Sequence, residues 1–334
     1  MYKPFISIIV TAYNRRKYIR QAIQSVINST LPRDSYELIV VKNFRDEFVD
    51  NIVEKLGGKS VLVDIAPIGA NISIGIKMAR GDVITFLEDD DMYHPVRLEV
   101  IADVFRRDPT IIYYHNNVVV IDELNSPVYD KMIERTNIPR KVVAKNGEEK
   151  LNAFKLYKWC LGLRPSAMAV RRSFIARWVN IIKLFPDLVD ILIYLFAIVN
   201  EGTVLHDPRR LTYYRVSETS ASSVRFVKDP VNRFIKAVKN AARHALARHM
   251  LVALAKYLGL SSYVGYDEAT VIGCIYRNCG RYSAHIIANL ENCKTIMSLG
   301  VTMVGVTYLL NPTLAKRLVY LYYTRLFNLC GLRF

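Results

Sequence analysis

The chain has 334 residues, of which 51% are hydrophobic and 23% charged, and it carries 46 Lys and Arg against 30 Asp and Glu. This composition excludes a disordered tail, a collagen-like fibre and a disulfide-rich mini-protein. The formal net charge of +16 predicts an anionic partner or surface, such as nucleic acid, acidic lipid headgroups or a phosphorylated substrate.

Three smaller features indicate where the protein works. The five cysteines lack Cys-x-x-Cys spacing, which argues against a zinc site or a secreted disulfide framework and favours a reducing, cytoplasmic compartment. Residues 1–4 lead directly into an apolar stretch of strand length, so we expect no signal peptide. The chain has only two glutamines, Gln21 and Gln24, and scarce thermolabile amides favour a thermophilic source, which we expect to be an archaeon.

Strand and helix patterns alternate along the first 125 residues. Apolar runs of strand length lie at residues 6–10, 37–41, 60–65, 83–87 and 111–121. Helical periodicity covers residues 16–28, 48–56, 69–79 and 95–106. This alternation predicts an α/β sandwich with a mostly parallel sheet.

The rest of the chain is organised differently. Residues 125–165 are polar and basic, which predicts a long crossing loop, whereas residues 166–199 are apolar and mostly helical in pattern. A short strand is expected at 211–216, followed by a hydroxyl-rich loop at 217–223. Composition changes near residue 225, so we predict an α/β domain of residues 1–224 and a basic, helical region of residues 225–334.

Four consecutive carboxylates, Glu88-Asp89-Asp90-Asp91, directly follow the apolar run 83–87. Such side chains repel one another unless a cation lies among them, and ligands of open α/β sheets bind at the carboxyl ends of strands. Oxygen ligands suit Mg²⁺ or Mn²⁺, which bridge carboxylates to phosphate oxygens. A solvated acidic turn is the alternative, but the position after a buried strand in a basic chain favours a metal–phosphate site.

Three stretches, in this order and spacing, carry a resemblance to a known family: FISIIVTAYNRRKYIRQAIQSVINST, MARGDVITFLEDDDMYHPVRLE and LTYYRVSETSAS. They resemble the inverting glycosyltransferases of family 2, well over residues 4–110 and more loosely over 160–223. The resemblance implies the nucleotide-sugar-binding α/β fold called GT-A and a divalent metal, Mn²⁺ or Mg²⁺. It also implies direct displacement at the anomeric carbon with inversion.

The resemblance assigns roles to residues at the strand ends. The acidic motif would place Asp90 as the direct metal ligand, Glu88 at the metal or the ribose, and Asp89 beside the nucleotide sugar. The small-residue turn after the first strand would contact the nucleotide through Thr11, Tyr13 and Asn14.

The sequence also departs from the family pattern. Lys42-Asn43 stand where the family usually has two aspartates; Asn43 could hydrogen-bond a base edge, and Lys42 could reach a phosphate. Ile72 replaces the family's arginine, so phosphate neutralisation is expected from Lys42 or the metal. Arg215 could hold a diphosphate oxygen or be a strand surface charge, and Ser217 follows where the family often has histidine.

An inverting transfer needs a carboxylate that takes the acceptor hydroxyl's proton. The family keeps an aspartate at the start of a helix, and Asp190, before an apolar helical run, matches that place, with Asp187 as the second candidate. Apolar neighbours would raise the pKa of the carboxylate by desolvation, which suits a base. Alternatively, Asp187 merely caps the helix.

The C-terminal region combines basic and apolar residues. Between residues 225 and 256 there are eight Lys and Arg against one acid, at spacing typical of a basic amphipathic helix, and residues 294–334 contain no acid. We predict peripheral contact with an anionic membrane at its cytoplasmic face. The alternatives are a packed helix with a solvated basic face and a span at residues 295–315, which lack charge over 21 residues.

The sequence therefore predicts a metal-dependent glycosyltransferase that moves a sugar from a nucleotide-sugar donor to a glycan or a polyprenyl-phosphate-linked acceptor. A relative that binds nucleotide or glycan without transfer is the main alternative, because of Lys42, Asn43 and Ser217. A nucleotidyltransferase would need a glycine-rich loop after the first strand, which VTAYNRR lacks. Nucleic acid is not an expected partner, because the basic residues follow no nucleic-acid-binding pattern.

Overall fold

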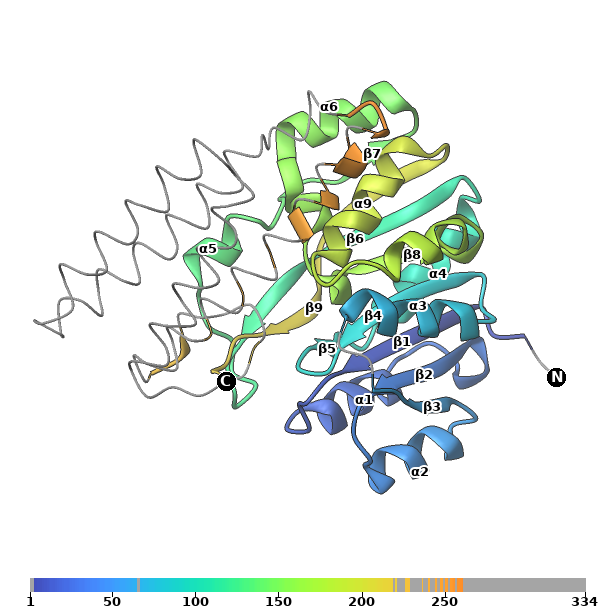
Figure 1. The fold of residues 1–334 in the computed structure, drawn as a ribbon, viewed down its shortest axis with the longest axis vertical. Helices are drawn as coiled ribbons and strands as arrows, with labels where there is room; N and C mark the ends of the chain where they lie inside the picture. Colours follow the sequence, from blue (N-terminus) through green and yellow to red (C-terminus); the bar gives the residue numbers. More distant parts are fainter. Residues whose placement is uncertain are drawn as a thin grey trace, which may run out of the picture. The chain divides into compact units, whose positions relative to one another are not determined.

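The computed structural model describes residues 3–64 and 67–218, together with residues 220, 226–228, 236, 240, 244, 247–248, 250–251, 253–255 and 257–260. Within these residues nine strands form one sheet: β1 (Ile6–Ala12), β2 (Tyr36–Lys42), β3 (Lys59–Leu62), β4 (Val83–Glu88), β5 (Met92–Tyr93), β6 (Ile111–Ile121), β7 (Val142–Ala144), β8 (Met168–Arg171) and β9 (Thr203–Arg215). Figure 1 shows the strands side by side across the molecule.

The strand order is β3-β2-β1-β4-β8-β6-β9-β5, with β7 pairing with β9. The long pairings, which join β1 to β2, β1 to β4 and β6 to β9, are parallel. The short strands β5, β7 and β8 pair antiparallel. From β1 the chain adds β2 and β3 on one side of the sheet and then β4 on the other side. Open α/β sheets bind ligands at the carboxyl ends of the strands where the strand order reverses in this way.

Helices cover both faces of this sheet. The α-helices are α1 (Ile19–Ile27), α2 (Glu47–Lys55), α3 (Ile68–Met78), α4 (Arg97–Arg107), α5 (Lys131–Glu134), α6 (Gly147–Tyr157), α7 (Arg172–Ile175), α8 (Val179–Ile182) and α9 (Val189–Val199). Four short 3₁₀ turns occur at Arg33–Ser35, Lys158–Gly162, Pro165–Ala167 and Ala176–Trp178.

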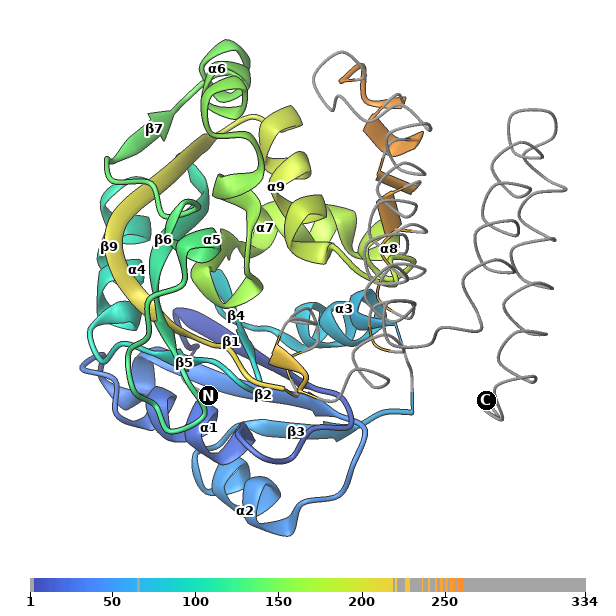
Figure 2. The ribbon, with the colours of Figure 1, turned by 90° about the vertical axis from the view of Figure 1, so that its left-hand side faces the viewer.

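Alternation along the strands assigns the two faces. Ile8 and Val10 of β1 belong to one buried cluster together with α1, α2 and α4. Ile9, between them, belongs to another cluster with α3, α8 and α9. The sheet therefore lies between two layers of helices (Figure 2), and the predicted α/β sandwich with a mostly parallel sheet is confirmed.

Two expectations about the later chain were wrong. Residues 125–165 are not one loop, because they contain α5, β7 and α6. The side chain of Asn146 accepts a hydrogen bond from the Glu149 N–H at 3.0 Å and so caps α6, and the buried Ala153 and Phe154 anchor it. The strand expected at 211–216 is part of the longer β9, which begins at Thr203. Its first half was missed because it contains the polar residues His206 and Asp207, which are nevertheless buried in the sheet.

Most of the residues predicted to contact a membrane lie outside the described part of the chain. No helix among the residues described here is both long enough and apolar enough to cross a bilayer. The uncharged stretch 295–315 and the boundary expected near residue 225 lie outside the described residues. The domain division and the membrane contact stay predictions.

Candidate functional site

A cavity of about 290 Å³ opens where the carboxyl ends of β1 and β4 lie side by side. Thr11 near the end of β1 pairs in register with Glu88, the last residue of β4. The turn after β1, the acidic turn after β4, the segment 163–165 and the start of α9 all contribute to the lining. Among the lining groups are Glu88, Asp90, Asp187 and Asp190, so the cavity brings the predicted metal ligands and the predicted bases together.

The acidic turn is folded tightly into the protein. The Asp91 N–H donates to the Glu88 carbonyl at 3.2 Å, and the side chains of Asp89 and Asp91 are each 1% exposed. Burial, and then the neighbouring carboxylates, raises the pKa of Glu88 well above its usual range and that of Asp91 to about 7. The turn therefore holds more negative charge than its surroundings stabilise.

The carboxylates suit a divalent cation held jointly with a phosphorylated ligand. Asp89 Oδ2 and Asp91 Oδ2 are buried without a hydrogen-bond partner among the described residues, and leaving such oxygens unpaired is costly. No cluster of three His, Cys, Asp or Glu side chains within the described ranges could hold a metal alone. The acidic turn thus fits Mg²⁺ or Mn²⁺, which Asp90 and Glu88, the carboxylates of the turn that line the cavity, would hold together with a phosphorylated ligand.

Arg15, in the turn after β1, reaches across to this acidic turn. Its Nη1 donates to Asp90 Oδ2 at 2.6 Å, and its Nη2 forms an ion pair with Asp89. Burial lowers the pKa of Arg15, but Asp90 and Asp89 outweigh it, so the pKa is raised overall. This contact cannot be predicted from the sequence, because the neighbouring Arg16 has the same charge and only the folded backbone decides which of the two arginines points toward the acidic turn.

The predicted nucleotide turn is locked to the end of β2. Asn14 has a φ of 56°, its N–H donates to Asn43 Oδ1 at 2.7 Å, and Asn43 Nδ2 donates to Asn14 Oδ1 at 2.8 Å. Thr11 is buried and Tyr13 half-buried beside them. One N–H of Asn43 stays available for a base edge, so the structure brings together the turn and the residue predicted to contact the nucleotide.

Lys42 does not line the cavity. Its ammonium is 2% exposed, donates to the Phe44 carbonyl at 3.0 Å and forms an ion pair with Asp50 at 2.9 Å. These contacts point it toward α2, so its assignment as a phosphate ligand stays a prediction that the geometry does not favour.

Arg215 is buried and forms hydrogen bonds with the acidic turn. The side chain is 1% exposed and donates to the carbonyls of Asp90 at 2.8 Å and Asp122 at 2.7 Å and to Gln21 Oε1 at 2.9 Å. Its backbone N–H donates to Asp91 Oδ1 at 2.9 Å. With these donors engaged, Arg215 positions Asp90 and Asp91, and its predicted diphosphate contact is untested.

Asp190, in the first turn of α9, lies at the cavity with both carboxylate oxygens held. The Arg164 N–H donates to Oδ2 at 2.9 Å and the Ile191 N–H to Oδ1 at 2.8 Å. Burial raises the pKa of Asp190 to about 6, despite these hydrogen bonds. The carboxylate is therefore ionised near neutral pH yet far more basic than an exposed aspartate.

Asp187 precedes the helix and does not cap it. The N-cap residue of α9 is Leu188, which has a left-handed φ of 56°, and Asp187 Oδ1 instead accepts a hydrogen bond from the Leu188 N–H at 2.8 Å. His244 Nε2 lies 3.1 Å from Asp187 Oδ2. Both aspartates therefore line the cavity with both carboxylate oxygens engaged, and they differ in their partners: two backbone N–H groups for Asp190, and one backbone N–H and a histidine ring for Asp187.

Sequence reasoning missed two further lining residues besides Arg15. Arg164 has a φ of 66°, which turns its N–H toward Asp190, and its guanidinium lies 4.9 Å from the Tyr214 ring centroid. His244 comes from the basic region and reaches the site only through the fold. No local pattern marks any of them, because their roles depend on contacts with distant residues.

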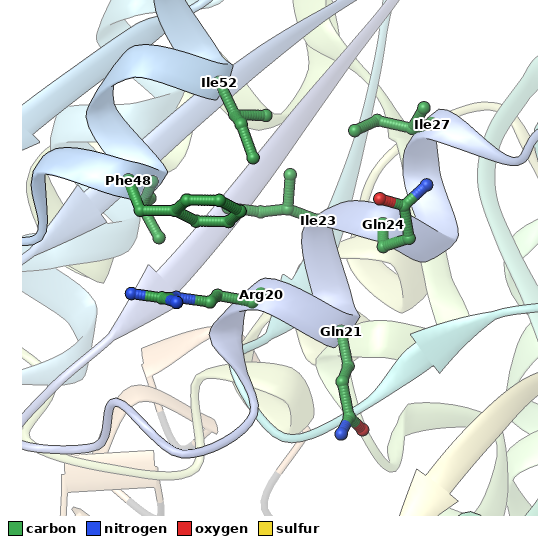
Figure 3. Close-up of a pocket in the computed structure, with 8 residues that line it drawn as sticks. Arg20, Gln21, Ile23, Gln24, Ile27, Phe48 and Ile52 are labelled. Atoms are coloured by element: carbon green, nitrogen blue, oxygen red, sulfur yellow. The ribbon is translucent and has the colours of Figure 1, made fainter.

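A second cavity, of about 260 Å³, lies between α1 and α2 and is mainly apolar (Figure 3). Phe48 and Ile52 face Ile23 there, and the Arg20 guanidinium lies 4.2 Å from the Phe48 ring centroid. None of the predicted site residues lines it. The cavity at the acidic turn is therefore the candidate active site.

Comparison with known proteins identifies the family of the chain. The sequence matches Glycosyl transferase family 2 over residues 7–178, a span that includes β1, the acidic turn and β8. An uncharacterized glycosyltransferase of Rickettsia typhi is 27% identical over 131 residues. That match covers 38% of this chain and 41% of the relative's length.

Solved structures support the GT-A fold. The chain superposes on Staphylococcus aureus TarS 1–349 in complex with UDP-GlcNAc with a TM-score of 0.52 and 20% identity, over 76% of this chain and 71% of TarS. For the mannosyltransferase PcManGT of Pyrobaculum calidifontis, in complex with GDP-Man and Mn²⁺, the TM-score is 0.50 at 13% identity, over 98% and 88% of the two chains. From the family match over half its length, together with this fold, the chain belongs to glycosyltransferase family 2.

Proposed function

We propose that this chain transfers a sugar from a nucleotide-sugar donor to an acceptor hydroxyl, with inversion, in the cavity between the acidic turn and α9. One observation carries the proposal: Asp190, with a pKa raised to about 6, lines the same cavity as Asp90 and Glu88. A base and a diphosphate-binding acidic turn in one cavity are the two parts that a direct displacement needs.

The residues divide the work between donor and acceptor. Asn14 and Asn43 hold the nucleotide, and the acidic turn faces the diphosphate. A divalent cation held by Asp90 and Glu88 would supply positive charge to the leaving diphosphate. Asp190 orients the acceptor hydroxyl and takes its proton as the oxygen attacks the anomeric carbon, while the bond from that carbon to the diphosphate oxygen breaks on the opposite side.

Related structures and the composition of the chain indicate the classes of donor and acceptor. TarS is solved with UDP-GlcNAc and PcManGT with GDP-Man and Mn²⁺, which supports a nucleotide-sugar donor here. Asn43 in place of an acidic residue leaves the base open. The basic C-terminal region favours a glycan or polyprenyl-phosphate-linked acceptor at the cytoplasmic face of a membrane, and the scarcity of glutamine favours a thermophilic archaeal source.

A donor screen tests the activity. The full chain is incubated with UDP-GlcNAc, UDP-glucose or GDP-mannose and Mn²⁺, and both binding and release of the nucleoside diphosphate are measured. We expect at least one donor to bind and to be turned over. Binding without release, with any acceptor offered, would instead favour the relative that binds without transfer, and absence of both would contradict the proposal.

Asp90→Asn tests the metal site. Because a neutral amide is a poor ligand for a hard cation, we expect Mn²⁺-dependent nucleotide binding and transfer to be lost. Calorimetry with and without Mn²⁺ separates this loss from unfolding, and Asp103→Asn, an exposed aspartate on α4, is the matched control. Undiminished Mn²⁺-dependent binding in Asp90→Asn would rule out Asp90 as the ligand.

A further inference from the structure

One carboxylate oxygen of Asp90, the predicted metal ligand, is already occupied by a side chain of the protein. Asp90 Oδ2 accepts a hydrogen bond from Arg15 Nη1 at 2.6 Å, and the other end of the same guanidinium is ion-paired with Asp89. Arg15 itself lines the cavity. A cation that binds Asp90 through this oxygen must therefore displace Arg15.

The other cations near the site are engaged elsewhere. Lys42 contacts Asp50 and the Phe44 carbonyl, and Arg215 donates to Gln21 and to two carbonyls. Arg164 lies over Tyr214 and donates to Thr136 Oγ1 at 3.0 Å. Lys236 interacts electrostatically with Asp90, but its ammonium donates to the Glu218 carbonyl at 2.8 Å. Among the described residues, Arg15 is the cationic side chain that forms ion pairs with the carboxylates of the acidic turn.

We propose that Arg15 is the diphosphate-binding residue of this site and that, without ligand, it serves as the internal counter-cation of Asp89 and Asp90. This inference rests on the proposed function. Its physical basis is that carboxylate and phosphate present the same paired oxygens to a guanidinium, so Arg15 can exchange one for the other without losing hydrogen bonds. When Arg15 binds the diphosphate, the carboxylates of Asp89 and Asp90 would be free to hold a divalent cation.

The exchange couples the two ligands. Metal alone must displace Arg15 and leave its guanidinium without an anion, so it binds weakly. Metal together with a nucleoside diphosphate provides Arg15 with a new anion, so each ligand strengthens the binding of the other. Arg15 thereby replaces the phosphate-neutralising arginine that the family has at the position of Ile72.

The test compares Arg15→Gln with Arg16→Gln. Arg16 is the adjacent residue; it is exposed, and its guanidinium lies 4.9 Å from the Phe44 ring centroid, so its variant removes the same charge without touching the carboxylates. Binding of Mn²⁺ alone is measured by electron paramagnetic resonance, and binding of UDP and GDP with Mg²⁺ by calorimetry. Circular dichroism checks that both variants fold.

The expected effects of Arg15→Gln have opposite signs. Mn²⁺ alone should bind about 10-fold more tightly than to wild type, because its competitor is gone, and the better of UDP and GDP should bind about 10- to 100-fold more weakly. Arg16→Gln should change neither affinity by more than about 2-fold. A merely structural role for Arg15 would weaken both ligands together.

Several outcomes would overturn the inference. They are an unchanged or weaker affinity for Mn²⁺ alone in Arg15→Gln, and a nucleotide affinity equal to that of Arg16→Gln. If wild type binds neither UDP nor GDP, the diphosphate role fails along with the proposed function. If wild type binds nucleotide and turns donor over but Arg15→Gln behaves like Arg16→Gln, this inference alone fails.

Discussion

At the scale of single residues, the two aspartates near α9 are distinguished by what holds them. Both line the cavity, but Asp190 accepts two backbone hydrogen bonds, whereas Asp187 accepts one from the Leu188 N–H and lies 3.1 Å from His244 Nε2. A base needs a fixed orientation and a raised pKa, and Asp190 has both. The two side chains therefore provide a matched pair for mutation.

Asp190→Asn is expected to lower kcat by about 10²- to 10⁴-fold, because the amide cannot take the acceptor's proton. Nucleotide-sugar affinity should stay within about 3-fold of wild type, since the group acts on the acceptor. Steady-state kinetics and calorimetry measure the two effects, with Asp187→Asn as the control. If Asp187→Asn shows the large loss and Asp190→Asn does not, the base is Asp187.

The pH dependence of turnover follows from the same carboxylate. The pKa of Asp190 is raised to about 6, so the base is protonated and inactive below that pH and ionised above it. We expect kcat to rise with pH up to about 6 and then level off. A pH–rate profile between 4.5 and 8 measures this, and Asp187→Asn should keep the inflection. A profile without an inflection between pH 5 and 7 would contradict the assignment.

A site residue can be predicted from the sequence when neighbouring residues along the chain determine its position, and it cannot when distant residues do. The acidic turn could be recognised because four carboxylates directly follow a buried strand. Asp190 is assigned by resemblance to the family's aspartate at the start of a helix, and it lies in the first turn of α9. Arg15 and Arg164 could not be predicted, because the orientation of Arg15 is set by Asp89 and Asp90, far along the chain, and that of Arg164 by a left-handed backbone.

At the scale of elements, β6 and β9 bury a histidine pair beneath the site. The Nδ1 atoms of His115 and His206 are 3.1 Å apart; His115 Nε2 lies 2.9 Å from the Leu163 carbonyl, and His206 Nε2 lies 3.2 Å from the Ile138 carbonyl. Two neutral imidazoles carry two ring protons, so only two of these three contacts can be hydrogen bonds at once. Adding the third proton would put a charge in the core.

The surroundings oppose that charge on His115. Burial, and then His206, Arg164 and Arg97, lowers its pKa. Burial also lowers the pKa of His206, although the Ile138 carbonyl and Asp207 oppose it. Below an unfolded pKa of about 6.5 the unfolded chain binds more protons than the folded one, so the free energy of unfolding falls as the pH falls.

Replacing one ring should reduce this acid sensitivity. We expect His206→Gln to lose about 1 kcal/mol less unfolding free energy than wild type between pH 7.5 and 5.5, whatever its stability at pH 7.5. Urea unfolding at a series of pH values measures the slope. His94→Gln, which replaces a half-buried ring stacked 6.0 Å from Tyr213 and outside the pair, is the control for the loss of a histidine. Equal slopes for all three would show that the pair does not titrate in this range.

These two strands also show why some elements escaped prediction. A polar residue within a strand lowers the apolar contrast that periodicity depends on, and β9 places His206 and Asp207 in its middle. Asp207 is paired with Arg209 and Tyr114, which makes its burial possible. Those partners are not apparent from the sequence of β9, whereas β1, β2 and β4 have mostly apolar centres and were recognised.

At the scale of the whole molecule, the net charge of +16 is the feature that the α/β fold does not explain. Much of the excess lies after residue 225. The fold class followed from alternating strand and helix patterns, because that alternation admits few arrangements. The membrane contact depends instead on residues outside the described part of the chain.

We expect the full chain to bind vesicles containing phosphatidylglycerol at low salt and to be released as the salt rises. Each Lys or Arg near an anionic surface contributes about 1 kcal/mol, which screening removes. Vesicle sedimentation at 20 mM to about 500 mM NaCl measures this, with phosphatidylcholine vesicles as the control. Binding that resists salt and yields only to detergent would favour a span at 295–315, and no binding at low salt would contradict both.

Left-handed backbone conformations gather around the candidate active site. Asn14, Arg164 and Leu188 all have φ between 56° and 66°, and each aligns a group described above: a nucleotide turn, a donor to Asp190, and the start of α9. Such conformations cost about 1 to 3 kcal/mol each and persist only where surrounding packing enforces them. The site is therefore preorganised by the fold itself, and a bound donor has little rearrangement of these three backbone positions to drive, so more of its binding energy remains for the transition state.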